Sequence, residues 1–128
     1  MKQLAWLSRY GPALTLMVII FMASSVPGAQ MPNAGALDLY VKKGGHMTGY
    51  ALLGLALVRA QGKASQKQIL LAILGCALYA LSDEFHQTFT AGRHPSLVDV
   101  GIDLVGTSLG MVVLTRLTAL RKLILVSK

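Results

Sequence analysis

The chain has 128 residues, which is enough for one domain and too few for two comfortable ones. Apolar residues make up 54% of it and charged residues only 13%, against roughly 25% charged in an average globular protein. A small soluble domain has much surface for its volume and needs polar side chains to cover it. The composition therefore argues against a disordered chain, a coiled coil and a disulfide scaffold, and it predicts a small integral membrane protein.

The net charge of +7 comes from 12 Lys and Arg against 5 Asp and Glu. A basic chain can bind nucleic acid, but these charges are few and lie between apolar runs instead of along one stripe. Anionic lipid headgroups and a topology signal explain the excess better, so we expect membrane lipids as partners and no nucleic acid. The single Cys76 lies in an apolar run, which rules out an internal disulfide and predicts a packing role.

The first long uncharged run covers residues 10–37 and contains an apolar stretch over residues 13–26. A transmembrane helix needs roughly 20 mostly apolar residues, so the run predicts a first span over about residues 11–26. Pro27 and Pro32 follow this stretch and should end the helix.

A cleaved signal peptide is the rival interpretation of this segment, with Lys2 and Arg9 as its basic region. Its apolar region would be long for a signal peptide, and residues 27–29, Pro-Gly-Ala, are a poor cleavage site. We therefore expect the segment to remain a membrane helix.

Three further uncharged runs are shorter, over residues 44–58, 68–82 and 104–115. Each alone could form a core helix, but each reaches spanning length when it is extended through the polar residues at one end. The predicted spans are then residues 42–59, 68–87 and 96–116. The basic and apolar tail after Arg116 is expected to lie at the inner lipid surface.

The loops predict the orientation. With four spans and both termini cytoplasmic, nine cations lie inside, namely Lys2, Arg9, Arg59, Lys63, Lys67, Arg116, Arg121, Lys122 and Lys128. The other three, Lys42, Lys43 and Arg93, lie outside with all five acids, Asp38, Asp83, Glu84, Asp99 and Asp103. The Lys and Arg bias sets orientation in chains with short loops. We therefore predict an all-α integral membrane bundle of four transmembrane helices, N-in/C-in, in the inner (plasma) membrane.

Polar residues recur at helical spacing on three of the predicted spans, always at the outer end. The stripes consist of Lys43, His46 and Tyr50; of Tyr79, Asp83, His86 and Gln87; and of Asp99, Asp103, Gly106 and Gly110. Ionisable groups within a span cost several kcal/mol unless they face the bundle interior or a wet cavity. We therefore expect one shared polar cavity that opens outward.

Glycines and a serine shape the surroundings of this cavity. Gly92 permits a tight turn before the fourth span, and Pro95 with Ser96 suits a helix start. Gly106 and Gly110 form a small-xxx-small pattern, which lets two membrane helices approach closely.

Residues 83–106 resemble the signature of the VanZ-like family, roughly D-E-x-x-Q-x-F-x-x-x-R-x-x-S-x-x-D-x-x-x-N-x-x-G. Upstream, residues 43–50 resemble the K-x-x-H-x-x-x-Y element of that family. The resemblance covers residues 39–110, and the helix count agrees with it. Asp103 stands where the family often has Asn, which adds a negative charge to the cavity.

The resemblance implies a single VanZ-like membrane domain over residues 1–128, at the cell envelope. The family is named for a protein linked to low-level resistance to the glycopeptide teicoplanin, so the resemblance also implies an influence on glycopeptide susceptibility. It supplies a fold, a membrane location and a site, and it leaves the reaction open.

Four functions are compatible with the cavity. It could bind a lipid headgroup or an envelope glycan, with Lys43, His46 and Arg93 clamping phosphate. It could be an enzyme that acts on a phosphorylated or lipid-linked envelope substrate, with catalysis by a residue from the set Asp83, Glu84, His46 and Asp99. It could be an ion or proton pathway, or a purely structural bundle that binds a partner.

The candidate binding residues are Lys43, His46, Tyr50, Asp83, Glu84, His86, Gln87, Arg93, Asp99 and Asp103. A divalent metal is a further alternative, but the histidines and acids lack tight ligand spacing, so we expect no metal and no cofactor. Each residue also has a structural interpretation: Lys43 could snorkel to the interface, and Asp83 could form a salt bridge with Arg93. Their common depth favours a shared functional cavity.

Overall fold

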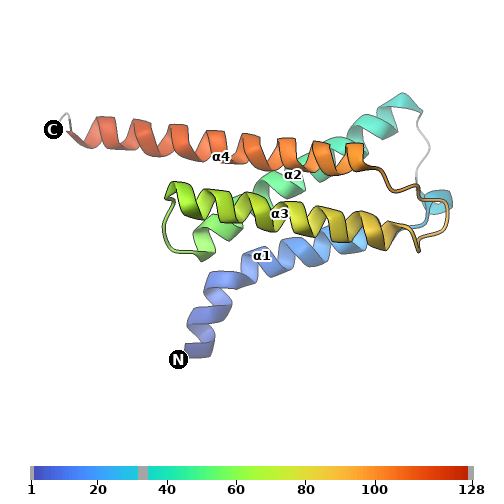
Figure 1. Ribbon diagram of the computed structural model, residues 1–128, viewed down its shortest axis with the longest axis horizontal. Coiled ribbons are helices and arrows are strands. Elements are labelled where there is room, and N and C mark those ends of the chain that lie inside the picture. The colour runs from blue at the N-terminus through green and yellow to red at the C-terminus, as the bar shows by residue number, and fades with distance from the viewer. Residues whose placement is uncertain (1, 32–34, 127–128) are drawn as a thin grey trace.

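The computed structural model describes residues 2–31 and 35–126, and these residues form an all-α bundle of four helices (Figure 1). The helices are α1 (Lys2–Ser24), α2 (Ala36–Ala60), α3 (Gln66–Gln87) and α4 (Leu97–Val126), with a 3-10 turn, η1 (Gly28–Gln30), after α1. Pro32 and Lys128 lie outside the described residues, as do the side chains of Lys2, Asp38, Arg121 and Lys122.

Three of these helices are long and apolar enough to cross a membrane, over Ala5–Ser24, Gln66–Gln87 and Leu97–Ala119. The chain is therefore a multi-pass membrane protein by helix composition. The predicted span of α2, residues 42–59, does not reach the same apolar content, because lysines, glycines and His46 occupy its first half.

Helix α1 bends beside Pro12, and Figure 1 shows its N-terminal part turned away from the other helices. Proline has no backbone N–H, so the carbonyl of Ser8 loses its partner within the helix. Arg59 of α2 replaces that donor, with 3.1 Å between its Nη1 and the Ser8 oxygen. In return, Arg9 donates from Nε to the carbonyl of Ala60. The two arginines thus fasten the bend of α1 to the C-terminal end of α2.

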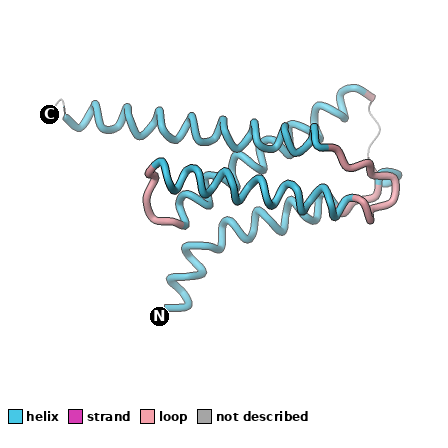
Figure 2. The backbone as a smooth tube through the Cα atoms, viewed as in Figure 1, coloured by secondary structure: helices cyan, strands magenta, loops and turns pink. Residues whose placement is uncertain are grey.

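Helix α4 continues to Val126 as one unbroken helix, beyond the predicted span over residues 96–116. No glycine or proline interrupts residues 111–126, so nothing in the chain ends the helix there. Thirty residues at a rise of 1.5 Å make a helix of about 45 Å, longer than the roughly 30 Å hydrocarbon core of a bilayer. Figure 2 shows its C-terminal part extending past the other helices.

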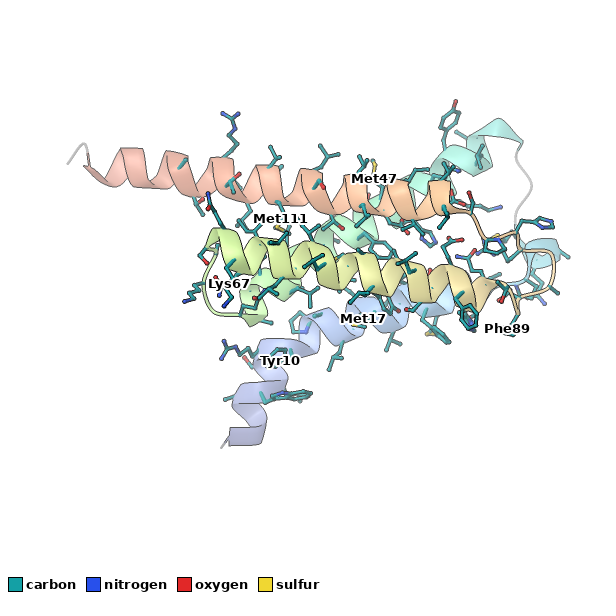
Figure 3. The ribbon with its side chains drawn as sticks, viewed as in Figure 1. Tyr10, Met17, Met47, Lys67, Phe89 and Met111 are labelled. Atoms are coloured by element: carbon teal, nitrogen blue, oxygen red, sulfur yellow. The ribbon has the colours of Figure 1, made fainter. Side chains whose placement is uncertain are left out.

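The closest helix contact joins α2 to α4 through glycine. A Cβ built on Gly106 would overlap the carbonyl oxygen of Met47, and one built on Gly110 would lie 2.9 Å from the carbonyl oxygen of Ala51. Met47 is marked in Figure 3. The small-xxx-small pattern is thus confirmed as a packing motif. Cys76 is fully buried in the core, as predicted.

We predict that Gly106→Ala destabilises the bundle by about 1–3 kcal/mol, because the new methyl group must push α2 away from α4. The matched control is Gly101→Ala, one and a half turns earlier in α4, where a Cβ meets no atom within 4 Å. Thermal unfolding of the purified variants in detergent measures both. Equal melting temperatures for the two variants would contradict the packing role of Gly106.

Candidate functional site

A cavity of about 110 Å³ lies where α2 and α4 begin and α3 ends, at the end of the molecule that carries Phe89 in Figure 3. We call it the polar cavity. Its walls are Leu39, Lys42, Lys43, His46, Glu84, Gln87, Arg93, Asp99, Ile102 and Asp103. Most of the predicted site residues therefore meet in one place, contributed by three helices and one loop.

Two pairs of side chains, one an ion pair and the other a histidine beside a carboxyl group, connect α2 to α4 across this cavity. The Nζ atom of Lys43 lies 2.6 Å from Oδ1 of Asp99, with both side chains about one-third exposed. One turn deeper, Nδ1 of His46 lies 3.6 Å from Oδ1 of Asp103, whose side chain is only 2% exposed. Because both pairs follow the helical repeat, they hold the two helices in one register.

Glu84 joins the end of α3 to the start of α4. Its Oε2 atom accepts the backbone N–H of Ser96 at 2.7 Å, and its Oε1 accepts a bond from Gln87 at 3.4 Å. The hydroxyl of Ser96 in turn accepts the N–H of Val98 at 3.1 Å. Ser96 thus sits at the helix start as predicted, and the Glu84 carboxyl lies where the helix dipole favours negative charge.

Arg93 caps α1. Its Nη2 donates to the carbonyl of Ala23 in the last turn of that helix at 3.1 Å, and its Nε donates to the carbonyl of Val26, two residues after the helix ends, at 3.2 Å. Within the described part of the chain Arg93 forms no salt bridge with Asp83, which was the structural alternative considered for this residue.

Asp83 lies below the polar cavity and not in its wall. It is 3% exposed, and its Oδ2 atom accepts a 2.6 Å bond from the hydroxyl of Ser24, which is fully buried in α1. Ser24 is a residue that the sequence reasoning missed. Its only signal was a polar pair of serines at the end of an otherwise apolar stretch.

His86 and Tyr50 also lie outside the cavity wall. His86 stacks on Phe21 with 4.3 Å between the ring centres, and its Nε2 lies 3.0 Å from the hydroxyl of Ser25. Tyr50 is fully buried, with ring centres 6.4 Å from His46 and 6.1 Å from Tyr79. The polar stripe predicted on α3 thus faces α1 for the most part, while Glu84 and Gln87 line the cavity.

Residues 10–119 match the family described as VanZ/LLP1. The chain belongs to the VanZ/LLP1 family. The match extends the resemblance found over residues 39–110 to α1, the helix that Arg93 and Asp83 bind. The comparison with curated proteins gave no match, and neither did the comparison with solved structures.

Three buried oxygen atoms of this VanZ/LLP1 protein have no hydrogen-bond partner among the described residues. They are the hydroxyl of Tyr50, Oδ1 of Asp83 and Oδ1 of Asp103. Most buried polar atoms in proteins are hydrogen-bonded, and an unsatisfied one costs about 1–3 kcal/mol. Such atoms indicate a region that is not arranged for stability alone.

The charges of the polar cavity are mixed. Lys42, Lys43 and Arg93 face the carboxyl groups of Glu84, Asp99 and Asp103, and the titratable His46 lies among them. Across the described residues, no three His, Cys, Asp or Glu side chains are grouped closely enough to hold a metal ion.

We predict that Ser24→Ala destabilises the protein by about 1–3 kcal/mol, because it removes the donor to a buried carboxyl group. The matched control is Ser82→Ala in α3, since the Ser82 hydroxyl is exposed and donates only within its own helix. Thermal unfolding in detergent compares the two. If both variants have the melting temperature of the native protein, the Ser24–Asp83 bond does not contribute to stability.

Proposed function

We propose that the polar cavity binds the phosphate-bearing headgroup of an envelope lipid at the outer face of the plasma membrane. The supporting observation is that donors from separate elements converge on one cavity, Lys43 and His46 from α2 and Arg93 from the loop 88–96. Arginine and lysine form strong charge-assisted bonds with phosphate. A glycan attached to such a lipid would find further partners in the carboxyl groups of the same walls.

Each of these donors is held in place by a partner. Lys43 is bonded to Asp99, His46 lies beside Asp103, and Arg93 is bonded to the end of α1. Side chains that are already ordered lose little conformational freedom when a ligand binds. The carboxyl groups of Asp99 and Asp103 thus hold Lys43 and His46 in position for a ligand.

A binding role fits these contacts better than catalysis. Among the candidate catalytic residues, Glu84 uses both carboxyl oxygens to hold Ser96 and Gln87, and Asp99 holds Lys43. Asp83 lies outside the cavity wall. A carboxyl group that acts as general base needs an oxygen within reach of the reacting group, and Glu84 and Asp99 are engaged in holding the site.

We propose four spans with both termini in the cytoplasm. The N-terminal end of α1 and the C-terminal end of α4 lie at one end of the molecule, and the loop 88–96 lies at the other (Figure 1). Helix α2 can cross as the fourth span because Lys43 and His46 face the acids of α4 instead of lipid. The cations Arg59 and Lys67 then lie inside, as the charge bias requires.

We expect a membrane-impermeant maleimide to label Thr90→Cys in intact cells, because the loop then lies outside. Lys63→Cys should be labelled only after the membrane is opened. Both variants are made with Cys76→Ala, so that each carries a single thiol. Labelling of Lys63→Cys but not Thr90→Cys in intact cells would show that the orientation is reversed.

We expect Lys43→Gln to weaken the binding of phosphatidylglycerol by about tenfold, since one charge-assisted bond contributes about 1.5–3 kcal/mol. Native mass spectrometry of the detergent-purified protein with added phosphatidylglycerol measures this affinity. The control is Lys63→Gln, which removes the same charge at the opposite end of the bundle and should bind as the native protein does. Equal losses in both variants would indicate attraction by net charge and no site.

A role in teicoplanin susceptibility is suggested by the family to which the chain belongs. If the headgroup belongs to an envelope lipid, deletion of the protein would change the lipid environment at the outer face. An altered susceptibility of the deletion strain to glycopeptides, restored by the native chain and not by Lys43→Gln, would support a role of the polar cavity in that effect.

A further inference from the structure

A second hollow, the α1–α2 groove, adjoins the polar cavity. It measures about 300 Å³ and is lined by Ile19, Ile20, Ala23, Met31, Val41, Lys42, Gly45, His46 and Arg93. Its size reaches the range of small-molecule sites. Apart from Lys42, His46 and Arg93, its walls carry no ionisable side chain, so the groove suits an apolar occupant.

The groove and the polar cavity share part of their walls. Lys42, His46 and Arg93 line both of them, so the cations stand at the junction between an apolar and a polar space. By contrast, the hollow beside Ser96 shares only Glu84 with the cavity, and the one along α4 shares nothing with it. Among the hollows formed by the described residues, the α1–α2 groove is thus the apolar one that shares Lys42 and Arg93 with the walls of the polar cavity.

The rims of the groove are exposed apolar side chains. Ile19 and Val41 on its rims are 55% and 64% exposed, while Ile20 at its base is 5% exposed. A Cβ built on Gly49 of α2 would lie 3.4 Å from the side chain of Ile20. A Cβ built on Gly45, one turn earlier, would meet no atom within 4 Å. The two helices therefore pack closely at Gly49 and leave room toward the cavity.

We propose that the α1–α2 groove holds a hydrocarbon chain of the same lipid whose phosphate headgroup occupies the polar cavity. This inference rests on the proposed function and narrows it, because the ligand must then be a lipid and not a free glycan or a soluble phosphate. Arg93 and His46 lie where the headgroup phosphate meets the chain. The lipid enters sideways from the bilayer, between α1 and α2.

The experiment uses phosphatidylglycerol with a diazirine in its acyl chain, in phosphatidylcholine nanodiscs that contain the full-length protein. After illumination, mass spectrometry locates the adducts. We expect them at groove residues such as Ile19, Ala23 and Val41. Gly45→Leu should lower their yield by about tenfold, because the new side chain would fill the part of the groove that the acyl chain needs.

Gly101→Leu is the matched control. Gly101 lies in the hollow along α4 and, like Gly45, has no atom within 4 Å of a built Cβ, so the two positions are matched in the space beside the backbone. It should leave the groove adducts unchanged. Excess unlabelled phosphatidylglycerol should suppress them, and excess phosphatidylcholine should not.

The two proposals fail in different ways. Adducts spread evenly over the lipid-facing helices, or the same loss in both glycine variants, would overturn the chain site. If Lys43→Gln still weakened phosphatidylglycerol binding in the mass-spectrometry assay, the headgroup site would stand without the groove. If Lys43→Gln had no effect there, the headgroup site itself would fall.

Discussion

The cost of placing charge in a membrane governs this structure. Lys43, His46, Asp99 and Asp103 lie on helices of a membrane protein, where an unpaired ion would be expelled or neutralised. Their two pairs, one turn apart, let α2 and α4 carry these groups facing each other. Gly106 brings the backbones close enough for the pairs to meet. Glycine packing and ion pairing therefore depend on each other along the same face of α4.

Such pairs contribute more to register than to stability. Taking two charges out of water offsets much of their attraction, so a partly buried pair adds little net free energy. A shift of α2 by one residue along α4, however, would separate both pairs at once. The arrangement thus selects one alignment of the helices, and that alignment leaves the polar cavity open between them.

Helical spacing was sufficient to predict much of the site. The i, i+3 and i, i+4 intervals place Lys43 with His46 and Asp99 with Asp103, and the cost of buried charge brings those faces together. The all-α class and three spans also follow from runs of apolar residues. The long α4 could have been predicted as well, since residues 111–126 contain no residue that ends a helix.

The partners of α3 could not be predicted in the same way. A polar stripe shows which residues share a face but not which neighbouring helix that face contacts, so His86 was expected in the cavity and lies against Phe21. The partners of Arg93 are backbone carbonyls, which every residue has, and they leave no mark in the sequence. Ser24 was hidden because serine hydroxyls are common in membrane helices, so the pair at residues 24–25 did not stand out.

The bend at Pro12 has a mechanical consequence. Arg59 fills the hydrogen bond that the proline cannot make, and Arg9 crosses in the opposite direction to Ala60. The segment before the bend, which carries Trp6 and Tyr10, is thus hydrogen-bonded to the C-terminal end of α2. Lys43 lies toward the other end of the same helix. Any swing of that segment must either break both arginine hydrogen bonds or move α2 with it, so a displacement at the N-terminal end of α1 is transmitted to the walls of the polar cavity.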